Sequence, residues 1–227
     1  MKKLSVAIAA IAAGFMGMSS AQAYEAGDMI LRVGAASVNP DDSSSDIKIG
    51  GSAVGNTGVG VKDNTQVGIT GTYMLTSNIG IELLAATPFK HDITGKGLIS
   101  SAFGVDNVGS VKHLPPTLSA QYYFADSKSA WQPYVGLGLN YTTFFSEELS
   151  GSAKSNLGAS DLKLDDSWGL AVEAGFDYSF NSNWMVNVSV WKADIDTTAT
   201  LNTALGKAEV DVQIDPIVYM VAVGYKF

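Results

Sequence analysis

The sequence lacks cysteine altogether and has only six prolines and two histidines among its 227 residues. After the N-terminal segment, no apolar run approaches the roughly 20 residues that a membrane-spanning helix requires. Without cysteine, the chain has none of the disulfides that staple many secreted domains. Any membrane insertion must therefore use strands, because a closed barrel is the other structure that satisfies every backbone group in lipid.

Basic side chains are also scarce, with 14 Lys and Arg against 22 Asp and Glu. Removal of a signal peptide containing Lys2 and Lys3 leaves 12 basic residues and a net charge of about −10. A nucleic-acid partner is not expected, since such proteins carry a basic footprint. The acidic segments either keep the protein soluble or recruit divalent cations, and solubility is the simpler interpretation.

The N-terminus has the three parts of a secretory signal. Lys2 and Lys3 precede an apolar run over residues 4–18, and the small-residue site Ala21-Gln-Ala23 predicts cleavage before Tyr24. We therefore expect residues 1–23 to be a signal peptide and residues 24–227 to form the mature protein outside the cytoplasm.

The last stretch, residues 217–227, alternates with the period of a strand. Ile217, Tyr219, Val221, Val223 and further odd-numbered residues up to Phe227 share one wholly apolar face. A soluble edge strand of this kind would aggregate, whereas a strand between lipid and a lumen needs this pattern. Similar alternation predicts strands at about residues 28–38, 65–75, 79–89, 118–124, 134–144, 168–180, 184–191 and 210–227.

The connections between these strands alternate in length. Long Ser-, Gly- and Asp-rich loops are expected at about residues 39–63, 90–110 and 146–165, with a shorter fourth loop near 202–207. Tight turns are expected at residues 76–78, 125–130 and 181–183. The prediction is an all-β fold, an eight-stranded antiparallel transmembrane β-barrel with both termini periplasmic.

A soluble β-sandwich or lipocalin-like barrel would also show short alternating strands. Three features favour the membrane barrel: aromatic residues at both ends of the apolar faces, glycine-rich opposite faces, and the terminal Phe227. In the last strand, the apolar positions change parity at Asp215-Pro216, which predicts a bulge there.

The same alternation assigns side chains to the lumen. Charged inward positions are expected to form a structural network, because buried charges must be paired, although ion or proton passage is an alternative. These positions are Arg32, Glu82, Glu173, Asp177 and Lys226. Further inward positions are apolar: Leu84, Ala86, Phe144, Trp191, Ala193 and Met220.

Several segments closely resemble the outer membrane protein W family. They are residues 78–89, 113–117, 133–136, 140–145, 165–169, 190–191 and 194–198, and the resemblance runs in order through essentially the whole mature chain. It implies an eight-stranded barrel in the outer membrane of a Gram-negative bacterium, with a hydrophobic upper channel thought to pass small apolar molecules. The family's lumen constriction, a leucine and a tryptophan, matches Leu84 and Trp191 here, and the loops match poorly.

Proline cannot donate a hydrogen bond to a ladder. Pro88 and the pair Pro115-Pro116 fall on adjacent predicted strands near the outer end. Our hypothesis is that pairing is broken there, which opens a lateral route from the lumen into the bilayer. The alternative is that these prolines merely end the strands at the rim.

Neither histidine indicates a catalytic site or a metal site. Simple parity places His91 outward with Phe89, and His113 inward with Ser119, although the intervening prolines interrupt the count. Two histidines without a third ligand form no metal signature, and no serine converges with them as a nucleophile would require. We expect no enzyme activity and no cofactor.

The sequence therefore predicts a monomeric barrel in outer-membrane lipid that acts as a narrow passive channel or pocket for small hydrophobic compounds. For Leu84 and Trp191, ordinary lumen packing is the simpler alternative to a constriction. The alternative function is a structural or receptor barrel whose loops bind phage, bacteriocin or host molecules while the lumen is sealed.

Overall fold

The computed structural model describes residues 24–126 and 129–227, so the predicted signal peptide lies outside the described residues. Eight strands form a closed antiparallel barrel, in which each strand pairs with two neighbours and β10 pairs with β11 to complete the ring. These are β1 (Met29–Asn39), β6 (Asn64–Met74), β7 (Ile79–Ala86), β10 (Thr117–Tyr123), β11 (Trp131–Leu149), β13 (Ser167–Ser179), β14 (Trp184–Ala193) and β17 (Ile217–Lys226). The predicted fold is confirmed.

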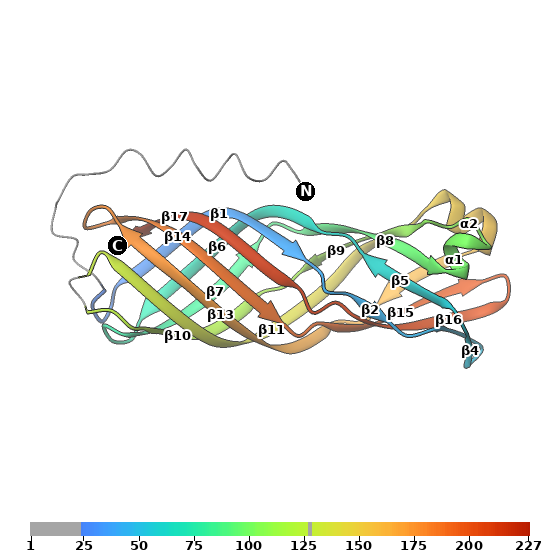
Figure 1. Ribbon diagram of the computed structural model, residues 1–227, viewed down its shortest axis with the longest axis horizontal. Coiled ribbons are helices and arrows are strands. Elements are labelled where there is room, and N and C mark those ends of the chain that lie inside the picture. The colour runs from blue at the N-terminus through green and yellow to red at the C-terminus, as the bar shows by residue number, and fades with distance from the viewer. Residues whose placement is uncertain (1–23, 127–128) are drawn as a thin grey trace.

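Short turns lie at the barrel end that holds the C-terminus, and the long connections extend from the other end (Figure 1). The backbone N–H of Phe227 donates to the carbonyl of Met29, which ties the last residue to the first barrel strand. Both ends of the barrel chain are therefore periplasmic. Within the described residues, no helix has the length and apolar character needed to cross a bilayer.

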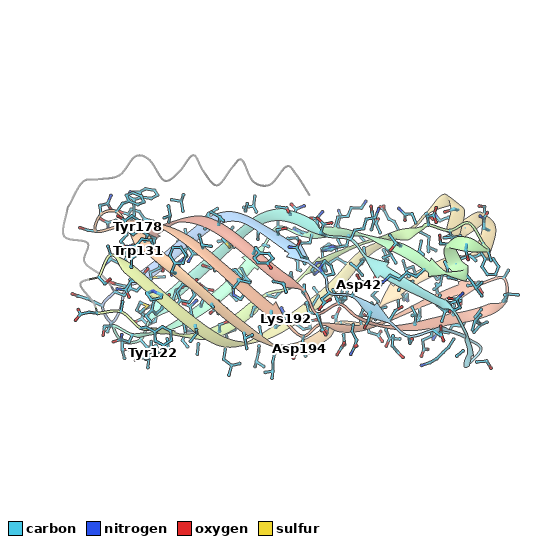
Figure 2. All side chains as sticks on the ribbon, in the orientation of Figure 1. Asp42, Tyr122, Trp131, Tyr178, Lys192 and Asp194 are labelled. Carbon is cyan, nitrogen blue, oxygen red and sulfur yellow. The ribbon has the colours of Figure 1, made fainter. Side chains whose placement is uncertain are left out.

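An apolar belt surrounds the barrel, because the outward residues of every strand are exposed aliphatic or aromatic side chains. Near the C-terminal end of the barrel, Trp131 packs against Tyr178 with ring centroids 4.8 Å apart (Figure 2). Trp168 and Tyr141 form a similar pair, 4.6 Å apart, toward the opposite end. Aromatic residues thus border the belt on both sides, as expected for the two interfaces of a membrane.

The predicted long loops are wrong in part, since much of their length forms strands that extend the barrel outward (Figure 1). One extension sheet contains β5 (Thr57–Val61), β8 (Phe89–Gly97), β9 (Asn107–Leu114) and the outer part of β11. The other contains β12 (Ser160–Leu164), β15 (Asp196–Thr203), β16 (Gly206–Gln213), β3 (Ile47–Ile49) and β4 (Ser52–Val54), with β2 (Ser43–Ser44) beside β16.

Apolar side chains hold these extensions together. Val59, Ile93, Val111 and Val210 are buried in one cluster with residues from both sheets. Two short helices, α1 (Leu98–Ser101) and α2 (Gly151–Leu157), lie at the outer end. The Ser, Gly and Asp content of these segments hid the short apolar alternation that forms the strands.

Two interruptions reset the direction of side chains. Asp215 has a φ of 37°, in the left-handed region, between β16 and β17. The predicted change of parity at Asp215-Pro216 is thus present, but it separates two strands of different sheets and is not a bulge within one strand. A second break separates β7 from β8 at Thr87-Pro88. It makes the expected outward directions of Phe89 and His91 wrong, since both side chains are buried.

Candidate functional site

The lower lumen is closed by a buried polar cluster around Arg32, which is 1% exposed. Its Nε donates to Asp177 Oδ1 at 2.9 Å, and its Nη2 donates to Asp177 Oδ2 at 2.5 Å. Its Nη1 donates to Glu82 Oε2 at 3.0 Å and to Thr72 Oγ1 at 2.7 Å. Tyr24 adds a hydrogen bond to Asp177 at 2.5 Å. These contacts place a buried, hydrogen-bonded ionic cluster across the lower lumen.

The other two charged residues predicted for the lumen are Glu173 and Lys226. Glu173 is buried beside this cluster, where its carboxylate faces Gln121 and Glu82. Lys226 forms an ion pair with Asp28 at 3.3 Å near the periplasmic end. Buried carboxylates with one arginine favour a packed network over an open pore.

Above the cluster lies a small apolar pocket of about 30 Å³, which we call the middle pocket. Leu84 from β7 and Trp191 from β14 both line it, and Met220 from β17 belongs to the same buried cluster. Ala86 also lines this pocket. The structure thus brings together the two residues matched to the family constriction, at a level directly above the charged floor.

The wall of the middle pocket includes the proline break. Pairing between β10 and β7 ends at Thr117 and Leu84, and pairing of the next strands resumes at Phe89 and His113. The intervening residues, which include Pro88, Pro115 and Pro116, have no ladder partner across this seam. Both Ala85 and Pro115 line the pocket, so the pocket reaches the wall where the ladder is interrupted.

Further out, a cavity of about 350 Å³ lies between the extension sheets, and we call it the outer cavity. Its lining is almost wholly apolar, with Val59, Ile93, Val111 and Phe144 among the buried members. Phe103 and Leu205 also line it and are exposed at 42% and 73%. An apolar lining with exposed apolar residues at its edge is typical of a binding cavity.

Four rings separate the two cavities, and we call them the ring layer: Phe89, His91, His113 and Phe144. Phe89 stacks on His113 at 5.4 Å, His91 and His113 are 4.8 Å apart, and Phe144 stacks on His113 at 5.9 Å. His113 lines both cavities. Sequence reasoning placed Phe144 and His113 inward but missed the layer as a whole, because the parity change at Pro88 turns Phe89 and His91 inward as well.

Burial favours the neutral form of both histidines in the ring layer. They lie on β8 and β9, outside the eight membrane-spanning strands. Burial lowers the pKa of His113 to about 3, helped by the neighbouring His91, and burial also lowers the pKa of His91. The layer therefore keeps the apolar character of the cavities that it separates.

A closed barrel with a lipid-facing apolar belt, short turns at one end and long extensions at the other defines a bacterial outer-membrane β-barrel protein. The OmpW family profile matches residues 25–227, and the chain belongs to the OmpW family. It is therefore a protein of the outer membrane of Gram-negative bacteria, embedded in lipid.

Individual comparisons agree with this assignment. The chain is 48% identical to outer membrane protein W of Vibrio cholerae, with 100% of both chains covered. It matches the crystal structure of the outer membrane protein OprG from Pseudomonas aeruginosa at 49% identity and a TM-score of 0.86, covering 91% of this chain and 99% of that one. A more distant relative, 24% identical over 82% of each chain, is the dibenzothiophene metabolism operon protein PahQ of Pseudomonas aeruginosa.

Proposed function

We propose that this barrel provides a passive route for small hydrophobic molecules from the cell exterior into the outer membrane. The observation that carries the proposal is the succession of an apolar outer cavity, a small apolar middle pocket and a charged floor. A hydrophobic molecule is stabilised in the outer cavity and in the middle pocket, whereas the charged floor excludes it. Axial passage to the periplasm would require desolvation against buried ions, which is costly.

The outer cavity supplies the driving force for uptake. An aromatic ring system offers on the order of 150–250 Å² of surface, and its removal from water contributes roughly 4–6 kcal/mol. The name of the PahQ relative refers to metabolism of dibenzothiophene, an aromatic compound, which is consistent with such a ligand class. Entry into the outer cavity therefore needs no charged side chain to attract the ligand.

The exit is lateral, through the wall between β7 and β10. The ladder is interrupted beside Pro88 and Pro115, and the middle pocket touches this place at Ala85. The ring layer lies between the cavities, so passage requires at least one of its side chains to move. Leu84 and Trp191 form the bottom of the pocket and direct the molecule sideways.

Uptake of a fluorescent hydrophobic probe tests the proposal. Cells that make the wild-type protein are compared with cells that make Trp191→Ala and with cells that make none, at equal amounts of folded barrel. We expect wild-type cells to take up the probe several-fold faster than cells without the protein, with an altered rate in Trp191→Ala. Equal rates in all three would contradict transport and leave the structural or receptor barrel as the better function.

A further inference from the structure

Three buried nitrogen atoms along the proposed route have no hydrogen-bond partner among the described residues. They are Nε2 of His91, Nδ1 of His113 and Nε1 of Trp191. The three side chains are 3%, 6% and 2% exposed. A buried polar atom without a partner destabilises a protein, so these atoms need an explanation that apolar packing does not supply.

The donor or acceptor character of His91 follows from its neighbour. Its Nδ1 contacts the backbone carbonyl oxygen of Lys62, and a carbonyl can only accept, so Nδ1 carries the proton. A neutral imidazole has one N–H, and Nε2 of His91 is therefore left with a free lone pair. This ring lines the outer cavity, and its Nε2 is covered by neighbouring atoms, so a ligand reaches this acceptor when the ring layer moves to let it pass.

Trp191 presents the opposite character in the middle pocket. An indole Nε1–H donates and cannot accept. Trp191 lines that pocket, and its Nε1 is covered by neighbouring atoms until a ligand displaces them. Along the route, a ligand thus meets an acceptor at His91 and later a donor at Trp191. A hydroxyl group serves both, because it can donate one hydrogen bond and accept others.

We propose that the route selects small apolar molecules that carry one hydroxyl group, aliphatic or aromatic alcohols, over hydrocarbons of the same size. The inference rests on the proposed function and specifies its ligand class. The hydroxyl donates to His91 in the outer cavity and accepts from Trp191 in the middle pocket. His113, which lines both cavities, offers its own unpartnered nitrogen between them.

Two simpler explanations fit less well. If the ring layer served packing alone, phenylalanine at positions 91 and 113 would fill the same space without leaving nitrogen atoms unpaired. A metal site would need further ligands, and the described part of the chain contains no group of three or more His, Cys, Asp or Glu side chains placed to hold an ion.

The test compares binding of 1-octanol and n-nonane, which have equal numbers of non-hydrogen atoms. Purified barrel in lipid nanodiscs is titrated with each, and binding is followed by the NMR signals of labelled histidine and tryptophan rings. Empty nanodiscs correct for partition of each ligand into lipid. We expect His91→Phe to weaken octanol binding about tenfold and to change nonane binding less than twofold.

Matched variants separate hydrogen bonding from shape. His91→Gln places an amide oxygen near the position of Nε2 and should restore part of the preference for octanol. Phe144→Leu alters the same ring layer without removing a nitrogen, so it should affect both ligands equally. If His91→Phe does not fold, Trp191→Phe removes the donor and is expected to lower the octanol-to-nonane ratio in the same direction.

The possible results distinguish the two proposals. If neither ligand binds the wild-type barrel, the proposed function fails and the inference falls with it. If both ligands bind and the ratio of their affinities is the same in the wild type and in the nitrogen-removing variants, only the preference for alcohols is overturned.

Discussion

Arg32 and Asp177 form a two-point ion pair in the lower lumen, although 145 residues separate them in the sequence. Each nitrogen–oxygen contact is at most 2.9 Å, and both side chains are almost fully buried. The pair joins β1 to β13 across the barrel interior. It makes the floor of the lumen a structural element and turns the apolar route above it toward the wall.

Removal of one partner of this pair should destabilise the barrel strongly. Arg32→Met leaves the carboxylates of Asp177 and Glu82 without their cation, and such changes cost about 3–5 kcal/mol. The measurement is urea unfolding of the purified protein in lipid vesicles. Lys192→Met is the control, because Lys192 is 42% exposed and makes surface contacts, an ion pair with Asp41 at 3.7 Å and a hydrogen bond to the Asp215 carbonyl at 3.1 Å. The control should lose at most about 1 kcal/mol, and equal losses in both variants would contradict this role.

A cross-link across the proline break should stop lateral exit. Extension of the ladder beyond Leu84 and Thr117 would place Ala85 opposite Pro116, and the chain has no cysteine of its own. We expect Ala85→Cys with Pro116→Cys, joined by a short bifunctional thiosulfonate, to reduce probe uptake nearly to that of cells without the protein. A reducing agent should restore uptake.

The control for this experiment is a cross-link in the intact ladder. Leu83 and Leu118 are register partners, and both face lipid. Leu83→Cys with Leu118→Cys should leave uptake unchanged after the same treatment. Unchanged uptake in the first variant, with the cross-link verified by mass spectrometry, would rule out an exit at this seam.

Two glycines in the barrel wall should differ in how much stability they lose when replaced by alanine. A methyl group at Gly34 would overlap the carbonyl oxygen of Val221 and lie 2.5 Å from the Cα of Ala222, whereas one at Gly71 meets nothing within 4 Å. Overpacking against backbone costs about 1–3 kcal/mol. Gly34→Ala is therefore expected to lower the free energy of unfolding by that amount and Gly71→Ala to change it little. Similar values would show that β1 and β17 can move apart freely.

The stability of the ring layer should decrease in acid. The pKa of His113 is lowered by burial to about 3, below the ordinary value of 6.5, so between these values the unfolded chain binds a proton that the folded protein excludes. Stability is then lost as pH falls from 6.5 toward 3, by about 1.4 kcal/mol per pH unit. The hydrogen bond with the backbone carbonyl of Lys62, and then the charges of Asp63 and Asp92, oppose the effect of burial on the pKa of His91, so His113 should dominate.

Urea unfolding from pH 7 to pH 4 measures this loss, with His113→Phe as the comparison. The variant should lack the part of the acid sensitivity that His113 contributes. The same dependence on pH in both proteins would show that His113 titrates normally in the folded state.

Much of the barrel could be predicted from the sequence because strand periodicity is local. Residues 168–180 and 217–227 alternate without interruption, and the structure places their even- and odd-numbered side chains on opposite faces, as expected. The break at Asp215 could also be found, because its signal is a change of parity beside a proline. Such features depend only on neighbouring residues and on the geometry of an extended chain.

The directions of Phe89 and His91 could not be found in this way. Pro88 interrupts the strand, and the number of residues by which parity shifts at a break depends on the register of the next pairing, here Phe89 with His113. The extension sheets escaped prediction for a related reason. Their strands are short, and their apolar residues are recognised as a core only when segments such as β5 and β16 meet.

The amino-acid sequence by itself determined the number of membrane strands, the side of each strand that faces lipid and the polarity of the chain, because alternation with period two is encoded locally. Only the tertiary structure decided which inward side chains meet: Arg32 with Asp177, Leu84 with Trp191, and His91 with His113. Barrel closure and strand register bring together residues that are distant in the chain, and both depend on the pairing of all the strands at once.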